Sequence, residues 1–235
     1  MAEAMSQPTI AVIIFPGTNC ELDAQHAVSI AGANAKMMWH SETDLTGVDA
    51  VIVPGGFAHG DYLRTGAIAR FSPIMKSVEE FAASGKPVLG ICNGFQVLCE
   101  AKLLPGALRK NAGMKFLCKE VELEVVSNDS PLTSELSVGD KRTIPINHFE
   151  GNYTCSDETL AELKANNQIV LRYTNNPNGS LSDIAGVCNE ARNVVGLMPH
   201  PERACEEILG SIDGKEMIAS FVKAAAESKA KLVNA

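Results

Sequence analysis

The sequence contains no long apolar run, no basic cluster and no excess of positive charge. Its first apolar run, TIAVIIF at residues 9–15, is far shorter than the roughly 20 residues that a membrane-spanning helix needs. No basic segment precedes this run, so we expect neither a signal peptide nor a membrane anchor. Acidic residues outnumber basic residues by 28 to 20, and the net charge is −8. Such a surface does not attract phosphate backbones, so we expect no nucleic-acid partner.

The sequence also lacks the cysteine spacings of disulfide frameworks and zinc sites. None of the seven cysteines stands in a CxxC pair, and the count is odd. This pattern is typical of reduced thiols in a reducing compartment. We therefore expect a cytoplasmic protein with no metal site. The cysteines are Cys20, Cys92, Cys99, Cys118, Cys155, Cys188 and Cys205.

The first half of the chain alternates short apolar runs with helical patterns. This alternation is typical of βαβ units, in which helices cover a parallel sheet. The expected strands are residues 9–15, 35–40, 49–56 and 87–92. The expected helices run up to Ala31, over 66–84 and over 94–103.

The second half has a different pattern. FLCKEVELEVV at 116–126 alternates charged and apolar residues, as a half-exposed antiparallel strand does. No linker, repeat or low-complexity tract divides the chain. We predict an α/β fold with a mostly parallel central sheet, flanking helices and an antiparallel extension, in one domain over 1–235 with its core at about 9–228. The remaining expected elements are strands at 143–147, 168–174, 184–189 and 194–198, and a helix at about 203–228.

One cysteine stands at a sharp junction between a predicted strand and a predicted helix. In KPVLGICNGFQVLCE (86–100), Gly90 and Gly94 flank Cys92 as G-x-C-x-G. This is the cysteine form of the nucleophile elbow, a turn so tight that larger side chains at the flanking positions would collide. The thiol would stand at a helix N-terminus, where the dipole favours a thiolate. A buried structural cysteine is the alternative. Because strand, glycines and helix agree, we predict a nucleophile.

A base and its orienting group follow in VVGLMPHPERA. Pro199 and Pro201 stiffen the turn around His200, and Glu202 is placed to accept a hydrogen bond from one imidazole nitrogen. The other nitrogen would then face the thiol. Taken alone, the segment equally fits a helix-capping turn with an exposed histidine. Together with the elbow, it predicts a catalytic triad.

Acyl chemistry also needs donors for an oxyanion. In elbow enzymes one donor is the amide after the nucleophile, here Asn93, and the other comes from the loop after the third strand. That loop is VPGGFAHGDYLR, where Gly55 and Gly56 have no Cβ and allow a substrate to approach their amides. A plain Pro-Gly turn is the alternative. No Lys-Ser/Thr follows the glycines, which excludes a Walker loop.

These motifs and their flanks resemble a known family. The segments GICNGFQVL, GGFAHGDYLRTGAIARFSPI and GLMPHPERA are similar to class I glutamine amidotransferases. With FPGTNCELD, EGNY and SDIAGVCNE, they resemble the stand-alone glutaminase subunits of phosphoribosylformylglycinamidine synthases. The resemblance spans residues 9 to about 225.

The resemblance implies a flavodoxin-like fold and a Cys92–His200–Glu202 triad that hydrolyses L-glutamine to glutamate and ammonia. It implies that a large synthetase subunit receives the ammonia for purine synthesis, and that a small bridging subunit completes the complex. ATP and Mg²⁺ are expected on the synthetase, because nothing in this chain resembles a nucleotide-triphosphate site. No cofactor is expected in this chain.

Further residues are candidates for the pocket or an interface. Gln96 follows Cys92 by four residues and shares its helix face, so its amide would reach the substrate unless it is a simple surface glutamine. Cys20 follows the first strand at the edge where α/β proteins bind ligands, although Thr18 and Glu21 around it also fit a capping box. The remaining candidates are Asp61, Arg64, His148 and Glu150.

The sequence departs from these relatives in two places. Ala58 and His59 replace a usual Ser-Tyr pair, and the change bears on contacts around Asp61 and Arg64. Phe149 fills a slot that is usually glycine or alanine, next to His148 and Glu150. Neither departure touches the triad.

Two other functions remain as alternatives. One is another cysteine hydrolase, such as a γ-glutamyl hydrolase or a protease-like relative. The second is a regulatory subunit that senses glutamine without catalysis, which would not need Cys92, His200 and Glu202 together. The apolar side of the C-terminal helix, with Met217, Ile218, Phe221 and Val222, is predicted to be core.

Overall fold

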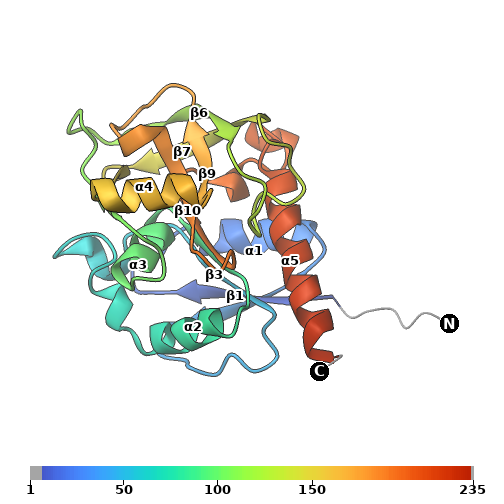
Figure 1. Cartoon of the computed structure of the whole chain (residues 1–235). Helices are drawn as coiled ribbons and strands as arrows, with labels where there is room; N and C mark the ends of the chain where they lie inside the picture. Colours follow the sequence, from blue (N-terminus) through green and yellow to red (C-terminus); the bar gives the residue numbers. More distant parts are fainter. Residues whose placement is uncertain (1–6, 234–235) are drawn as a thin grey trace.

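A nine-stranded mixed sheet forms the centre of residues 7–233, the part of the chain that this computed structural model describes (Figure 1). Five neighbouring strands are parallel, in the order β2-β1-β3-β4-β11. Such an order, 2-1-3-4 followed by a later strand, is that of flavodoxin-like folds. These strands are β1 (Thr9–Ile14), β2 (Asn34–Trp39), β3 (Ala50–Val53), β4 (Val88–Ile91) and β11 (Val194–Leu197).

The sheet continues beyond β11 with antiparallel strands, as predicted. The order there is β10-β9-β6-β7. Buried residues alternate with exposed glutamates along the end of β6, which confirms the half-exposed pattern. These strands are β10 (Ile184–Cys188), β9 (Ile169–Tyr173), β6 (Leu117–Val125) and β7 (Lys141–His148). Two short strands that the sequence did not predict, β5 (Ala107–Arg109) and β8 (Asn152–Thr154), pair separately.

Helices flank this sheet. Helices α1 (Glu21–Ile30) and α5 (Lys215–Val233) contact each other and β1, and α3 (Asn93–Glu100) packs against β3, β4 and β11. Figure 1 shows α5 on the right of the molecule, with α2 (Pro73–Ala83) and α3 on the left and strands between them. Helix α4 (Asp157–Ala165), which the sequence did not predict, is capped by Ser156. The α/β fold with an antiparallel extension is therefore as expected.

The expected helix over 66–84 is wrong in its first part. A short 3₁₀ turn, Ala69–Phe71, precedes α2, and Ser72 between them is extended. The residue before a proline disfavours the helical conformation, so Pro73 starts a new helix at its first position.

The expected helix over 203–228 begins too early. Residues Pro201–Arg203 and Glu207–Leu209 form separate 3₁₀ turns, and Gly210 ends the second with a left-handed φ of 96°. Helix α5 starts only at Lys215. The interruption is what places the histidine turn at the sheet edge.

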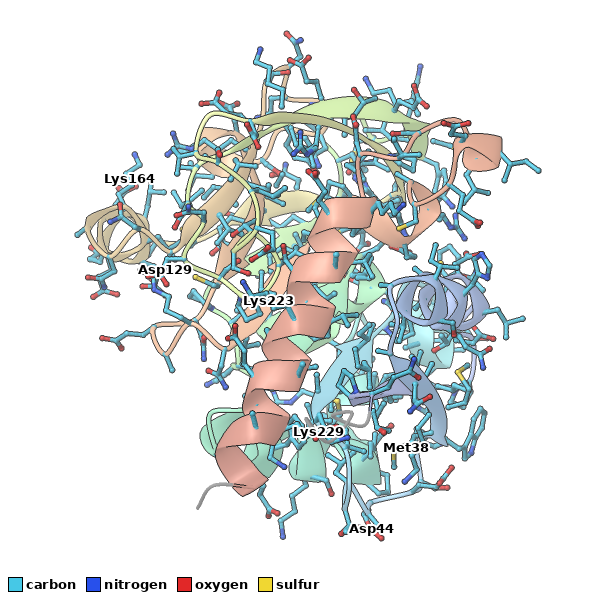
Figure 2. All side chains as sticks on the ribbon, turned by 90° about the vertical axis from the view of Figure 1, so that its right-hand side faces the viewer. Met38, Asp44, Asp129, Lys164, Lys223 and Lys229 are labelled. Carbon is cyan, nitrogen blue, oxygen red and sulfur yellow. The ribbon has the colours of Figure 1, made fainter. Side chains whose placement is uncertain are left out.

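Helix α5 packs its apolar side into the core and fixes its outer side with ion pairs. The side chains of Met217, Ile218, Phe221 and Val222 are buried, so the prediction that they belong to the core is confirmed. Figure 2 shows Lys223 and Lys229 along this helix. Lys223 binds Glu135 at 2.5 Å, and Lys229 lies 3.7 Å from Asp49. Within residues 7–233, every helix is too short or too polar to cross a membrane.

The carboxyl ends of four parallel strands bring the candidate residues together. Cys20 lies beyond β1, Gly55 and Gly56 follow β3, Cys92 follows β4, and His200 lies beyond β11. Because parallel strands end at the same edge, loops that are far apart in the sequence meet there.

Candidate active site

Cys92 stands on a strained turn between β4 and α3. Its backbone adopts φ 51° and ψ −105°, a region that costs a non-glycine residue about 1–3 kcal/mol. The flanking glycines make this turn possible: a Cβ on Gly94 would lie 1.7 Å from the carbonyl oxygen of Val53, and one on Gly90 would lie 2.8 Å from Gly94. The Cys92 amide donates to the Leu197 carbonyl at 2.8 Å. These contacts hold the thiol in one place.

His200 and Glu202 form a buried pair beside this thiol. Nδ1 of His200 lies 2.6 Å from Oε1 of Glu202. The exposed fractions of the two residues are 1% and 2%, so the alternative of an exposed histidine in a capping turn is wrong. Nε2 of His200 is buried and has no well-aligned hydrogen bond among the described residues. This nitrogen is therefore free to exchange a proton with a neighbouring sulfur.

The surroundings of His200 determine its charge. Burial opposes protonation most strongly, but the Glu202 carboxylate and the nearby sulfur atoms of Cys92 and Cys20 outweigh it and raise the pKa of His200 well above its usual value. An imidazolium beside a thiol is the arrangement that a cysteine nucleophile needs.

Three backbone amides near the thiol can receive an oxyanion. Gly56 has φ 151° and a Cβ there would lie 2.7 Å from Thr18 Cα, so only glycine fits. Asn93 is the first residue of α3, where an amide has no intrahelical partner. Within residues 7–233, the amides of Gly55, Gly56 and Asn93 donate no backbone hydrogen bond. Gly55 is needed for space, because a Cβ would lie 2.8 Å from the His200 ring.

Gln96 supports the wall of the site. Its Nε2 donates to the Glu150 carbonyl at 2.5 Å, and its Oε1 accepts from Asn93 Nδ2 at 2.8 Å. The side chain is 5% exposed, so a simple surface glutamine is excluded. Both ends of its amide are thus engaged by protein groups.

Asp61 and Arg64 lie apart. Asp61 Oδ1 accepts from Gly66 N and Asn93 Nδ2, and its pKa is raised, mainly because of burial. Arg64 binds Glu100 with two contacts of 2.6 Å and points away from the cavity. Of these two candidates, only Asp61 lines the cavity.

The two departures from the family pattern leave the site intact. The Ala58 amide donates to Asn93 Oδ1 at 2.9 Å, and His59 packs against His40 with ring centroids 5.1 Å apart. Phe149 lines the cavity, and its carbonyl accepts from the Asn111 amide at 2.9 Å.

The neighbours of Phe149 are ordered by a network around Asn111. Its Nδ2 donates to the carbonyls of Lys115 and His148, so its Oδ1 accepts from Gly151 N and from Nδ1 of His148. Burial is the main cause that lowers the pKa of His148 to about 4, and His200 adds to it. Glu150 Oε2 accepts from the Thr65 hydroxyl at 3.1 Å.

Cys20 is a pocket residue rather than a member of a capping box. Helix α1 has no side-chain cap, and the Thr18 hydroxyl accepts from Phe15 N instead. The Cys20 sulfur accepts from Arg203 Nη2 at 3.2 Å and lies beside His200. The motifs did not point to Arg203, although its place three residues after His200 in PHPER put it within reach.

One cavity of about 150 Å³ collects these groups. It is smaller than the roughly 300–1,000 Å³ pockets of drug-sized ligands, so it suits a small substrate. The Asn147 carbonyl, which the sequence did not single out, lies 3.7 Å from the Cys92 sulfur. The lining includes Cys20, Gly56, Cys92, Gln96, Glu150 and His200.

Comparisons with known proteins agree with this geometry. Residues 7–224 match the family model of the CobB/CobQ-like glutamine amidotransferase domain. The chain is 55% identical over 216 residues to phosphoribosylformylglycinamidine synthase subunit PurQ of Rubrobacter xylanophilus, covering 92% of this chain and 98% of that protein.

Two solved structures have the same fold. The structure of PurLQS from Thermotoga maritima contains a chain that is 44% identical, with a TM-score of 0.86 over 92% of this chain and 98% of that one. A GMP synthase component from Thermoplasma acidophilum is 16% identical with a TM-score of 0.66 over 97% and 98%, which shows the fold alone. By its sequence and its fold, this chain belongs to the family of CobB/CobQ-like glutamine amidotransferases.

Proposed function

We propose that the chain is the glutaminase subunit of a phosphoribosylformylglycinamidine synthase, which hydrolyses L-glutamine and supplies ammonia for purine synthesis. The observation that carries this proposal is the position of Cys92, on a strained turn beside the buried His200–Glu202 pair in a small cavity. The 55% identity to a PurQ subunit gives the reaction its metabolic place.

The reaction begins at the thiol. His200 takes the proton of Cys92, and the sulfur attacks the side-chain amide carbon of glutamine. The C–N bond then breaks, His200 returns its proton to the leaving nitrogen as ammonia forms, and a glutamyl thioester remains. His200 next deprotonates a water molecule that attacks the thioester. The C–S bond breaks, and glutamate leaves while the thiol is restored.

Backbone amides stabilise the charge that develops on the amide oxygen. Gly56 and Asn93 supply the two donors, and Gly55 leaves room for the substrate beside His200. Removing one such donor typically costs roughly 2.7–4 kcal/mol of transition-state stabilisation. Glu202 keeps the imidazole aligned through both steps.

The ammonia is consumed by a separate synthetase. The relative is named as a synthase subunit, and the solved relative comes from a PurLQS assembly. We assign ATP and Mg²⁺ to the synthetase subunit, and we include a small bridging subunit in the complex. The seven cysteines are unpaired, which fits a reducing compartment and a cytoplasmic location.

Covalent labelling tests this function. The chain, alone and mixed with its synthetase, is incubated with the glutamine-mimicking electrophile diazo-oxo-norleucine and digested for mass spectrometry. We expect the label on Cys92, and its loss in Cys92→Ala. The exposed Cys118 serves as the internal control for non-specific alkylation. Labelling of Cys118 as fast as Cys92, or glutamate release by Cys92→Ala, would contradict the proposal.

A further inference from the structure

A thiol, an imidazole and a carboxylate converge next to the nucleophile. One donor atom each from Cys20, His200 and Glu202 lies within 4.8 Å of the other two. All three residues are buried, with exposed fractions of 2%, 1% and 2%. The proposed hydrolysis uses His200 and Glu202 but gives no role to the sulfur of Cys20.

Two of these side chains have donor atoms that the described part of the protein does not satisfy. Nε2 of His200 and Oε2 of Glu202 are inaccessible to solvent and have no well-aligned hydrogen bond within residues 7–233. Buried polar atoms without a partner are rare in folded proteins, and those that occur often belong to sites that bind an ion or a water molecule. The cluster therefore has free coordinating capacity.

The donor set indicates which ion would bind. Sulfur, imidazole nitrogen and carboxylate oxygen are the ligands of Zn²⁺, and three protein ligands leave a fourth position open. Zinc–sulfur and zinc–nitrogen bonds of about 2.3 and 2.0 Å place tetrahedral S and N ligands about 3.6 Å apart. The observed limit of 4.8 Å exceeds this by about an ångström, which a rotation of the Cys20 side chain can remove.

The surroundings favour a soft ion over a hard one. The Arg203 guanidinium donates to the Cys20 sulfur at 3.2 Å, and its charge opposes any cation in the cluster. A thiophilic ion gains a bond to sulfur that offsets this repulsion, whereas Mg²⁺, which prefers oxygen ligands, gains little. The cavity beside Cys20 and His200 provides space for the fourth ligand.

We propose that Cys20, His200 and Glu202 form a site for Zn²⁺ or a similar thiophilic divalent cation, although the cysteine spacings in the sequence predicted no metal site. The bound ion occupies the imidazole that Cys92 requires, so metal binding and glutamine hydrolysis exclude each other. This exclusion rests on the proposed function, whereas the metal site itself does not. Cys20 thereby makes the glutaminase sensitive to zinc.

Zinc affinity of the purified full-length chain tests the site without glutamine or synthetase, so the result does not depend on glutaminase activity. Zn²⁺ is titrated in competition with a chromophoric chelator, and Mg²⁺ is titrated for comparison. We expect one Zn²⁺ per chain and no Mg²⁺ binding. Cys20→Ser should weaken zinc binding by about tenfold or more, since a thiolate ligand is lost. Cobalt in place of zinc should show a sulfur-to-metal charge-transfer band that Cys20→Ser abolishes.

A matched cysteine variant separates this site from surface binding. Cys118→Ser removes an exposed thiol on β6 and should leave the affinity unchanged. Glu202→Gln removes the carboxylate donor with little change of shape, and it decides the matter if thermal melts show that Cys20→Ser is misfolded. Wild-type zinc affinity in Cys20→Ser, or in Glu202→Gln, would overturn the proposal. So would an equal loss of affinity in Cys118→Ser.

Discussion

Nδ1 of His200 lies 2.6 Å from Oε1 of Glu202, and neither side chain is exposed by more than 2%. In this position the carboxylate holds the ring with one nitrogen toward itself. It also favours the positive charge that appears on the imidazole when Cys92 loses its proton. The pair is made by residues two apart in the sequence, on a turn that Pro201 begins.

Glu202→Gln should lower the turnover of glutamine by roughly 10³–10⁴-fold, since an amide stabilises neither the required tautomer nor the imidazolium. The measurement is glutamine-dependent product formation by the assembled synthase. Activity of the same complex with free ammonia is the control and should be unchanged, because that reaction bypasses this chain. A fall in both activities would indicate damage to the assembly rather than to the triad.

Gly94→Ala should destabilise the fold by about 3 kcal/mol, because the added Cβ would lie 1.7 Å from the Val53 carbonyl oxygen. Urea unfolding measures the change in free energy. Gly113→Ala is the matched control: a Cβ there meets nothing within 4 Å, and its stability should stay close to the wild type. Equal stability of the two variants would show that the elbow tolerates a side chain.

The sequence predicted those parts of the fold and site that local physics determines. The glycines around Cys92 follow from the sterics of one turn, and the alternation in β6 follows from a sheet with one exposed face. The parallel order of the strands follows from the βαβ pattern. These features need no knowledge of distant residues, which is why the motifs were readable.

Contacts between distant segments could not be predicted in the same way. Helix α5 was expected from residue 203, but Pro201 and Gly210 divide the segment before Lys215. The short strands β5 and β8 exist only because they pair with each other. The position of Cys20 beside His200 depends on the ends of β1 and β11, which the sheet brings to one edge.

Gln96 distinguishes support of the wall from contact with substrate. Gln96→Leu leaves the Glu150 carbonyl and the Asn93 amide without their present partner. We expect a loss of about 1–3 kcal/mol in the free energy of unfolding, the usual effect of unsatisfied buried groups. Gln96→Glu keeps the acceptor for Asn93 but loses the donor, so it should fall between Leu and wild type. Unchanged stability together with a raised KM for glutamine would instead assign Gln96 to the substrate.

His148 should make the protein less stable in mild acid. Its pKa is lowered to about 4 in the folded chain, against 6.5 for an unperturbed imidazole. Above pH 6.5 both states are neutral, but between pH 6.5 and 4 the unfolded chain takes up a proton that the folded chain refuses. Stability therefore falls as pH falls through this window, by about 2 kcal/mol at pH 5 from this residue.

Urea unfolding at pH 7 and pH 5 measures this effect by comparing wild type with His148→Gln. The glutamine amide does not titrate, so the variant should lose about 2 kcal/mol less than wild type over that interval. His26→Gln is the control, since His26 is exposed and should leave the pH dependence close to that of wild type. If His148→Gln and wild type lost equal stability, the imidazole would have to be protonated in the folded protein. The hydrogen bond that places its proton on Nδ1 toward Asn111 could then not be the reason for its neutral state.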